Sequence, residues 1–425
     1  MRIVLFLNGL GLGGTEKAAA RWARGLRERN HDLWVLTLED GPRRREFEEA
    51  GIEIRVVPSL SSPIAEEFRS LRPDVIHAHA PGHPHRGDVL GEALAALPKI
   101  PVLQTNVFGQ ALNPKENRWT DFRLYVSWTS CVQAARRNFR RLDANFFRDA
   151  SVALYPLDPI EQPAESETRD FREKHGVASD EILFGRLSRP EPNKWTNLAL
   201  AAFRLAASHD PKTKLLLREP PSEIRRQLER ASDRDRFVVL PATNDVPELT
   251  ITIASIDVVL HTSVVGESFG YGIAEPMNLA KPVIANSTPW GDQAQIELVR
   301  HGEGGYIAST PASMAEKAHA LAADPSLRAE MGRRAQSHIR QLTNPEGSVD
   351  RLEAILRAVV ERQTNPFARD DLRRAEAAAR YLDQHQFGES WREQLSLRPF
   401  HYRVRFHQLR SAAKTRIFAI PAHGK

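Results

Sequence analysis

The sequence VVLHTSVVGESFGYGIAEPMNLAKPVIANSTPWG, residues 258–291, contains the pattern that decides the fold. Its apolar start is typical of a buried strand that ends near His261, and a glycine-flanked loop and a helical pattern follow. Glu267 lies in the loop and Glu275 lies eight positions later in the helix. Both carboxylates are therefore expected near the same helix N-terminus, one in the loop and the other about one helical turn inside the helix.

The segment that follows the first acid, Ser268, Phe269 and Gly270, is expected to present its backbone to a ligand. Because free amides at a helix N-terminus bind anions, we expect the diphosphate of an activated sugar there. Glu267 would then face the donor sugar and Glu275 the ribose. Acids in a first turn can instead serve only to stabilise the helix dipole. The occurrence of both acids with Phe269 and Gly270 after a strand favours the ligand-binding interpretation.

Apolar runs of strand length alternate with helical patterns on both sides of a linker that contains three prolines, residues 155–170. The runs before the linker are Ile3–Leu7, Leu33–Leu38, Ile52–Val57, Val75–Ala78, Val102–Thr105, Leu124–Trp128 and Val152–Tyr155. The runs after it are Ile182–Leu187, Lys214–Leu217, Phe237–Leu240, Asp257–His261 and Pro282–Ala285. This alternation predicts an α/β protein with two doubly wound, Rossmann-like halves that contain parallel sheets.

The expected domains follow from these patterns. They are an N-terminal domain at 1–158, a C-terminal domain at 171–345, helices that pack back on the body at 346–390, and a basic extension at 391–425. Asn344 and Pro345 form a plausible N-cap and first helical residue, and Asn365 with Pro366 predicts a second helix start.

The N-terminal stretch around Gly9, Gly11 and Gly14 supports two interpretations. The three glycines match a dinucleotide-binding fingerprint, with Glu39 and Asp40 where a ribose-binding acid would lie. That alternative predicts an NAD-dependent oxidoreductase. Two successive Rossmann-like halves favour sugar transfer instead, because a dehydrogenase usually pairs one such unit with a dissimilar partner.

Four segments together resemble a known family: the Glu-x7-Glu block, the Gly13-Gly14-Thr15-Glu16 loop, GRLSRPEPNK from residue 185, and KPVIANSTPWG from residue 281. Over residues 1–362 the chain resembles the retaining glycosyltransferases of the GT-B fold, family 4. The resemblance implies two Rossmann-like domains facing across a cleft. It also implies a nucleotide-diphosphate sugar held mainly by the C-terminal domain, and Gly13 and Gly14 bringing backbone amides near its phosphates.

The resemblance further implies catalytic cations on the loop after the first strand of the second half. A departing nucleotide diphosphate gains negative charge, so cations stabilise its transition state more than its ground state. Arg186 and Lys194 are the candidates, with Glu267 as the third catalytic residue. Their spacing is about two residues longer than usual, and Arg189 is the alternative donor-binding arginine.

The resemblance implies front-face retaining transfer to an acceptor hydroxyl on a glycan, a lipid-linked molecule or a small molecule. It also implies that no metal and no cofactor other than the nucleotide sugar are needed. A GT-B relative that isomerises nucleotide sugars, or binds them without catalysis, is the alternative.

The acceptor side is expected to include Glu16, His79 and Asn106. Asn106 replaces a histidine that the family often has in a Thr-x-His-Gly stretch, and an amide cannot shuttle a proton. Strand alternation places His77 and His79 on one face, and further histidines follow at positions 83 and 85. Metal binding by this group is an alternative to lining the acceptor side, as is a purely structural or solvated role.

Composition limits the other classes of function. The single cysteine, Cys131, excludes a disulfide framework within the chain and suits a reducing cytosol. The N-terminal apolar run is too short for a signal peptide, and no stretch approaches the length of a membrane span. A cytoplasmic protein, soluble or peripheral at the inner face of the membrane, is therefore expected.

The net charge of +5 is concentrated at the C-terminus. Residues 391–425 contain eight Arg or Lys and one acid, which leaves about −2 for the rest of the chain. This distribution does not favour a nucleic-acid partner, which would require basic residues across a folded face. Alternating basic and aromatic residues at 398–418 suit an anionic membrane or a lipid-linked phosphate. A solvated or packed arginine-rich tail is the alternative.

Overall fold

The structure is a computed structural model that describes the chain except residues 81–87, 110–115, 139, 192–193, 390–392 and 399–425. Its contacts divide the chain into two compact units, each described by itself. Unit 1 consists of Met1–Pro163, Ser268–Lys281 and Gly332–Leu382. Unit 2 consists of Ala164–Glu267, Pro282–Met331 and the chain from Asp383 onward.

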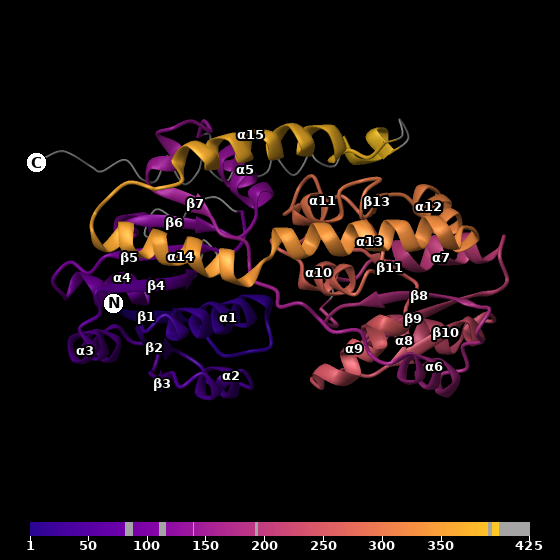
Figure 1. Cartoon of the computed structure of the whole chain (residues 1–425), viewed down its shortest axis with the longest axis horizontal. Coiled ribbons are helices and arrows are strands. Elements are labelled where there is room, and N and C mark those ends of the chain that lie inside the picture. The colour runs from indigo at the N-terminus through magenta and orange to yellow at the C-terminus, as the bar shows by residue number, and fades with distance from the viewer. Residues whose placement is uncertain (81–87, 110–115, 139, 192–193, 390–392, 399–425) are drawn as a thin grey trace, which may run out of the picture. The chain divides into compact units, whose positions relative to one another are not determined.

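Unit 1 contains a parallel seven-stranded sheet of order β3-β2-β1-β4-β5-β6-β7 (Figure 1). Its strands are β1 (Arg2–Leu7), β2 (Asp32–Thr37), β3 (Glu53–Val56), β4 (Val75–Ala80), β5 (Val102–Asn106), β6 (Phe122–Tyr125) and β7 (Ala150–Val152). The strand order reverses between β1 and β4. In doubly wound sheets the carboxyl ends of the strands at such a switch point are where ligands bind.

Helices cover both faces of this sheet. They are α1 (Gly14–Glu28), α2 (Arg44–Glu49), α3 (Ser61–Leu71), α4 (Val89–Ala95), α5 (Trp128–Arg137), α10 (Tyr271–Asn278), α14 (Pro345–Val360) and most of α15 (Ala368–His385). On one face Ile76 packs with Phe68 of α3 and Leu90 of α4. On the other, the ring of Trp22 in α1 lies 5.8 Å from that of His77, as the alternation of strand side chains requires.

Unit 2 contains a parallel six-stranded sheet of order β10-β9-β8-β11-β12-β13. Its strands are β8 (Ile182–Leu187), β9 (Thr213–Arg218), β10 (Phe237–Leu240), β11 (Val258–His261), β12 (Val283–Ala285) and β13 (Gly305–Ile307). Its helices include α6 (Glu165–Lys174), α7 (Leu198–Ala207), α8 (Ser222–Glu229), α9 (Val246–Ser255), α11 (Ala294–Val299) and α12 (Pro311–Ala323). The predicted class, two doubly wound units with parallel sheets, is confirmed.

The C-terminal helices connect the two units along the chain. α13 (Pro325–Leu342) begins in unit 2 and ends in unit 1, and α15 does the reverse at Leu382. α14 begins at Pro345, where the Asn344 side chain accepts a hydrogen bond from the Gly347 amide at 2.8 Å, as predicted.

The start of α15 differs from the prediction. The helix begins at Ala368 rather than at Pro366, because the Asn365 side chain has other partners. It accepts a hydrogen bond from the Phe367 amide at 2.9 Å and donates to the Ala150 carbonyl at 2.7 Å. Asn365 therefore anchors the turn before the helix.

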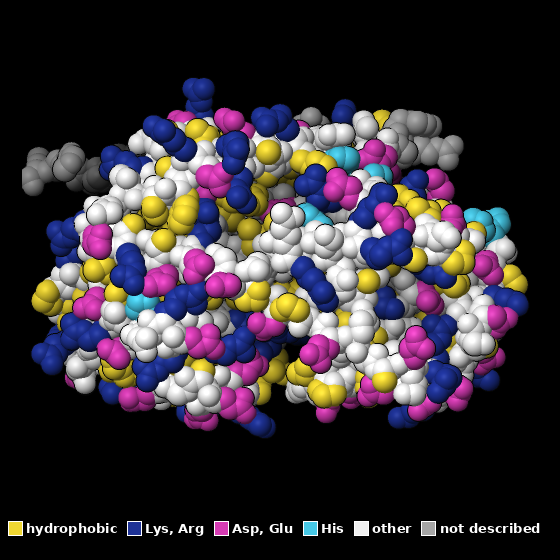
Figure 2. Space-filling model, in the orientation of Figure 1, with side chains coloured by type: hydrophobic (Ala, Val, Ile, Leu, Met, Phe, Trp, Pro, Cys, Tyr) yellow, Lys and Arg dark blue, Asp and Glu magenta, His cyan; other side chains and the backbone are white. Residues whose placement is uncertain are grey.

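Two surface properties can be stated for the described residues. Figure 2 shows Lys and Arg side chains interspersed with Asp and Glu over the visible face. None of the helices within the described ranges is both long and apolar enough to cross a bilayer. Residues 399–418, which hold nearly all of the expected membrane-contacting segment, lie outside the described residues, so that contact stays a prediction.

Candidate functional site

The loop after β11 places the first acid of the Glu-x7-Glu block. Gly266 precedes Glu267 with a φ of 74°, and a Cβ atom there would lie 1.8 Å from the carbonyl oxygen of Asp292. Only glycine combines this left-handed backbone with such a close approach. The residue therefore fixes the direction in which the chain enters Glu267.

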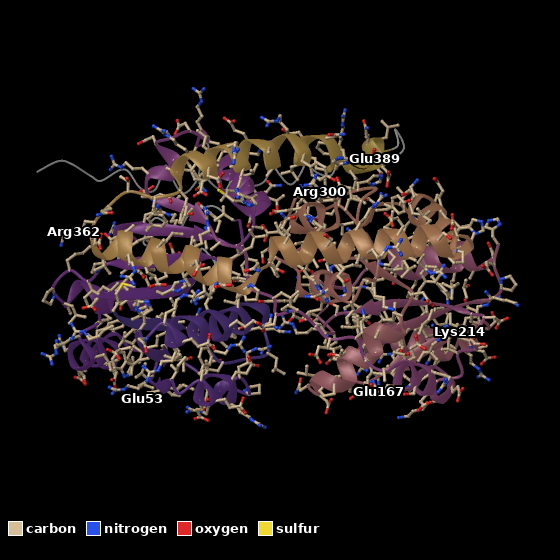
Figure 3. The ribbon with its side chains drawn as sticks, in the orientation of Figure 1. Glu53, Glu167, Lys214, Arg300, Arg362 and Glu389 are labelled. Atoms are coloured by element: carbon tan, nitrogen blue, oxygen red, sulfur yellow. The ribbon has the colours of Figure 1, made fainter. Side chains whose placement is uncertain are left out.

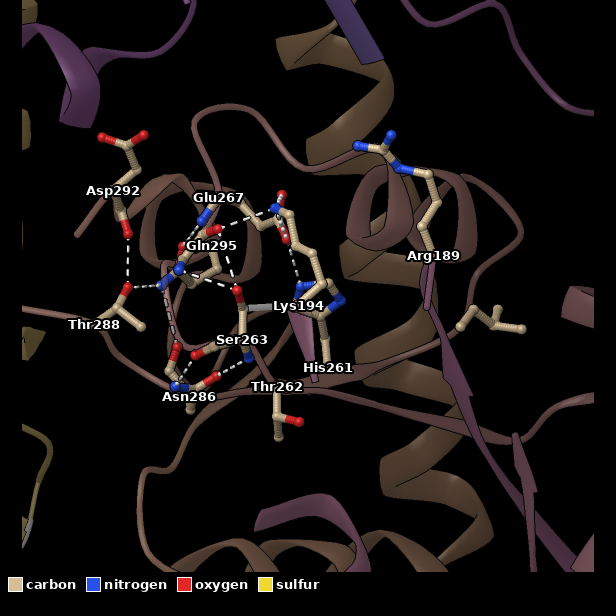
Figure 4. Close-up of polar contacts among 12 residues, drawn as sticks. Arg189, Lys194, His261, Thr262, Ser263, Glu267, Asn286, Thr288, Asp292 and Gln295 are labelled. Atoms are coloured by element: carbon tan, nitrogen blue, oxygen red, sulfur yellow. Dashed lines mark hydrogen bonds and ion pairs between the residues drawn. The ribbon is translucent and has the colours of Figure 1, made fainter. Parts of the chain in front are cut away.

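The carboxylate of Glu267 is held by two side chains at the carboxyl edge of the unit 2 sheet (Figure 4). Lys194 Nζ lies 3.0 Å from Glu267 Oε1 and 2.9 Å from Oε2, and His261 Nε2 lies 3.1 Å from Oε1. Although Glu267 lies in a loop, its side chain is only 14% exposed. The ion pair between Lys194 and Glu267 is therefore largely shielded from solvent.

The electrostatics of this cluster favour an ionised carboxylate. Burial alone would raise the pKa of Glu267, but Lys194 and the hydrogen bond with His261 outweigh it and lower the pKa to about 2. Burial lowers the pKa of His261 below its usual value, and the bond to Glu267 opposes that shift only partly. A neutral His261 with its proton on Nε2 donates a hydrogen bond to the carboxylate.

The backbone of Glu267 is held by the segment that follows β12. Its amide donates to Gln295 Oε1 at 3.0 Å, and its carbonyl accepts from the Ala294 amide at 2.8 Å. Gln295 donates in turn to Thr288 Oγ1 at 2.8 Å, and Asn286 Oδ1 accepts from the Ser263 amide at 2.8 Å. Sequence reasoning treated this segment only as part of the family resemblance, and it missed Gln295 and Asn286.

The predicted arginines lie in different surroundings. Arg186 is 1% exposed, and its guanidinium donates to the carbonyls of Leu187 at 2.7 Å, Lys194 at 2.5 Å and Thr262 at 2.5 Å. Burial lowers its pKa to about 10, which still leaves it charged at neutral pH. Arg189 is exposed, pairs with Glu191 at 3.0 Å, and has no drawn contact to the Glu267 cluster (Figure 4).

The second acid of the block belongs to unit 1. α10 begins after Gly270, which is in the left-handed region with a φ of 105°. The Ser268 carbonyl accepts from Ser127 Oγ at 2.7 Å, and the buried ring of Phe269 lies 4.9 Å from that of Tyr271. These contacts fix the entry into α10.

The carboxylate of Glu275 forms an ion pair with Lys17 of α1. Lys17 also lies 5.0 Å above the ring of Tyr271. Sequence reasoning did not single out Lys17, because the two residues are 258 positions apart. A ribose at Glu275 would therefore bind beside a lysine.

The two glycines at the start of α1 lie close to other side chains. Gly13, the N-cap of α1, has an ordinary extended backbone with φ −67° and ψ 163°, so an unusual dihedral is not the reason for a glycine there. A Cβ at Gly13 would instead meet the carboxylate of Glu16, and one at Gly14 would lie 3.3 Å from the Tyr271 ring. Close approach accounts for these glycines.

The structure brings the expected acceptor-side histidine and amide to the ends of β4 and β5. His79 and Asn106 are both buried, and among the described residues His79 Nδ1, His79 Nε2 and Asn106 Oδ1 have no hydrogen-bond partner. Burial lowers the pKa of His79 to about 3. The ring of His77 lies 4.3 Å from that of His79 and bonds Thr105 Oγ1 at 2.7 Å.

The metal-binding alternative for the histidine group receives no support from the described part of the chain. No group of three or more His, Cys, Asp or Glu side chains with the arrangement of a metal site occurs there. His83 and His85 lie outside the described residues.

Comparisons with known proteins agree with this architecture. Residues 13–173 match the family model described as Glycosyl transferase 4-like domain, and residues 167–338 match the one described as Glycosyl transferases group 1. A search of curated proteins gave no match.

Solved structures show the same fold. Alr3699/HepE of Anabaena in complex with UDP is 20% identical, with a TM-score of 0.70 over 84% of this chain and 100% of that chain. A glycosyltransferase from Rickettsia africae ESF-5 is 14% identical, with a TM-score of 0.69 over 84% and 98%. WaaG, a glycosyltransferase involved in lipopolysaccharide biosynthesis, is 13% identical, with a TM-score of 0.60 over 82% and 98%. Because the two family models together span residues 13–338, the chain belongs to the group 1 glycosyltransferases and has the GT-B fold.

Proposed function

We propose that this glycosyltransferase transfers a sugar from a nucleotide-diphosphate donor to an acceptor hydroxyl with retention at the anomeric carbon. The observation that carries the proposal is the Lys194–Glu267–His261 cluster in unit 2. Family membership stands against the oxidoreductase alternative. The donor proposal is further supported by Alr3699/HepE, which has been crystallised with UDP, with UDP-glucose, and with UDP and glucose.

In this proposal Glu267 binds the sugar of the donor and Lys194 faces its diphosphate. A carboxylate that stays ionised accepts hydrogen bonds from sugar hydroxyls but cannot donate one. Lys194 Nζ, which bonds both Glu267 oxygens at 2.9 and 3.0 Å, supplies the positive charge for the leaving diphosphate. Charge that develops on that diphosphate is stabilised most in the transition state, which is the condition for a faster reaction.

Helix α10 supplies a second source of positive potential. It is eight residues long and begins at Tyr271, four positions after Glu267 in the sequence. Its first amides are unpaired within the helix and suit a phosphate. Within unit 2, Lys194 and the buried Arg186 supply positive charge without a divalent metal, so we propose that the reaction needs none. Full activity in excess EDTA is the expected result, and loss that Mg²⁺ or Mn²⁺ restores would contradict it.

The acceptor is proposed to bind through unit 1 residues. Partner-free buried atoms on His79 and Asn106 suit the hydroxyl of a glycan, lipid-linked or small-molecule acceptor, since buried polar groups otherwise lack compensation. Glu16, half-buried in the first turn of α1, is the proposed third contact. Burial favours the neutral state of His79. In that state its unprotonated ring nitrogen can accept a hydrogen bond from the acceptor hydroxyl.

The proposed chemistry is a front-face substitution. The bond between the anomeric carbon and the diphosphate oxygen breaks while the acceptor oxygen bonds to the same face of that carbon. The acceptor proton passes to the leaving phosphate oxygen, so no enzyme carboxylate is needed as a nucleophile. The protein contributes positioning and charge stabilisation.

The test is a donor-hydrolysis screen over UDP-, GDP- and ADP-sugars without acceptor, followed by NMR of the released sugar. Turnover of one nucleotide sugar with the donor's anomeric configuration in the initial product is expected. Inverted product would refute the retaining mechanism. Interconversion of the sugar on the nucleotide would establish the isomerase alternative, and binding without turnover would establish a non-catalytic binder.

A further inference from the structure

A segment beyond both family models docks on unit 2. We call residues 383–389 and 393–398 the C-terminal latch. The family models end at residue 338, yet the latch belongs to unit 2, whereas the greater part of α15 belongs to unit 1. Figure 3 labels Glu389, which lies just after the end of α15.

A buried carboxylate anchors the latch. Glu393 is 1% exposed, and its Oε1 accepts hydrogen bonds from the Ser309 amide and from Ser313 Oγ, both at 2.6 Å. These partners lie at the carboxyl end of β13 and in the first turn of α12. A carboxylate at a helix N-terminus is favoured by the helix dipole and by free amides.

The backbone of the latch is shaped for this contact. Gly388 has a φ of 77°, and a Cβ there would lie 2.7 Å from Glu393 Cβ. A side chain at that position would be strained and would displace Glu393. Two residues before Gly388, the Gln386 carbonyl accepts a hydrogen bond from Ser287 Oγ at 2.5 Å. The latch therefore holds the chain after β12 as well as the chain after β13.

The chain after β12 is the same segment that fixes Glu267. Ser287 follows Asn286. The Asn286 side chain accepts a hydrogen bond from the Ser263 amide at 2.8 Å and donates one to the Ser263 carbonyl at 3.0 Å. Eight residues after Ser287, the Gln295 side chain accepts a hydrogen bond from the Glu267 amide. Ser309 Oγ also accepts from the Ser287 amide at 2.9 Å. A continuous hydrogen-bonded path thus runs from Glu393 through Ser309 and Ser287 toward the Glu267 loop.

We infer that Glu393 is a positioning residue for the donor-side loop, acting through Ser309, Ser287 and the segment 286–295. This inference rests on the proposed function of Glu267. When the latch is released, the segment 286–295 loses its contacts with the latch. Asn286 and Gln295 in that segment are then less firmly placed, and they no longer hold the Glu267 loop in a fixed position. Small displacements of catalytic groups can lower activity by up to about 100-fold.

The first test compares full-length Glu393→Gln with Glu316→Gln, a matched control on α12 whose side chain is 70% exposed. Hydrogen exchange of the unliganded proteins reports the Ser263 and Glu267 amides, which bond Asn286 and Gln295. Faster exchange at both amides in Glu393→Gln, with β9 unchanged, is expected. Faster exchange confined to residues 309–313 would overturn the inference.

The second readout is donor hydrolysis well below the melting temperature. We expect Glu393→Gln to lower kcat by roughly tenfold or more with a smaller change in KM, and Glu393→Asp to restore part of it. A lower melting temperature with unchanged kcat would show a merely structural anchor. If Glu393→Gln does not accumulate as folded protein, Ser313→Ala, which removes the bond from Ser313 Oγ to Glu393 Oε1, carries both measurements.

The two readouts separate this inference from the proposed function. Hydrogen exchange needs no turnover, so the coupling can be refuted while the wild-type protein hydrolyses its donor. Conversely, a wild-type protein without activity would refute the proposed function and leave the exchange result to decide whether Glu393 positions the loop.

Discussion

At the scale of single residues, Glu267 combines a fixed position with a fixed charge. Its backbone is held by Gln295 and Ala294, and its carboxylate by Lys194 and His261. We expect Glu267→Gln, which keeps the side-chain volume, to lower kcat for donor hydrolysis by about 100- to 1,000-fold, as loss of one preorganised polar contact does. The melting temperature and circular dichroism check the fold. Wild-type turnover in this variant would remove Glu267 from the chemistry.

The ion pair with Lys194 sets how Glu267 responds to acid. Its pKa of about 2 lies below the ordinary value of 4.5, so its ionisation stabilises the folded state above pH 4.5 and this contribution disappears as the pH falls toward 2. Lys194→Met removes the principal stabilising charge. We expect the difference in free energy of unfolding between wild type and this variant to narrow from pH 6 to pH 3, measured by urea titration. A difference that is constant over this range would contradict the ion pair.

At the scale of elements, regular strands were predictable and their partners were not. β8 and β10 begin and end at the predicted residues, because β10 is a continuous apolar run and β8 is one apart from Gly185 and Arg186. β13 was missed because it is only three residues long and begins with glycine. Gln295 was missed for a different reason, since its contact with Glu267 depends on β11 and β12 being neighbours in the sheet. The contact of His261 with Glu267 depends on how the loop after β11 turns back on the end of that strand. A motif marks the residue that binds a ligand, whereas the residues that hold it depend on strand order.

The attachment of α15 to unit 1 depends on one buried carboxylate. Asp371 is fully buried, pairs with Arg351, and accepts from Ser151 Oγ at 2.7 Å and Asn365 Nδ2 at 2.8 Å. Removing one partner leaves the others uncompensated, so Asp371→Ala should reduce the free energy of unfolding by about 3–5 kcal/mol. Urea denaturation measures it.

The neighbouring acid on the same helix is the control for this variant. Asp370 is partly exposed and pairs with Arg373 and Arg374 at 2.6 Å. Because such surface pairs contribute about 0–1 kcal/mol, Asp370→Ala should be nearly neutral. Equal losses in the two variants would mean that the buried network does not hold α15.

At the scale of the whole molecule, the chain continues beyond residue 338, where the matching family models end, and its residues 383–425 consist of two parts. The two parallel sheets were predictable from apolar runs and the family resemblance, whereas their strand order was not predicted. The division of residues 383–425 was not, because the latch is recognised only by where Glu393 and Gln386 bind. The described latch ends at Arg398, whereas most of the basic residues lie after it. The prediction assigned residues up to 390 to the C-terminal helices and, from net charge, merged residues 393–398 of the latch with the basic tail in one extension at 391–425.

This division predicts opposite results for two truncations. A chain ending at Arg398 keeps Glu393 and its contacts with Ser309 and Ser313, so its melting temperature and donor hydrolysis should match those of the full chain. A chain ending at Ser390 loses that anchor, and the Glu267 loop loses support. We expect a smaller rise in melting temperature with saturating nucleoside diphosphate, because weaker binding stabilises the folded state less by mass action. Identical nucleotide-induced shifts in the two truncated chains would show that the donor site is independent of the latch.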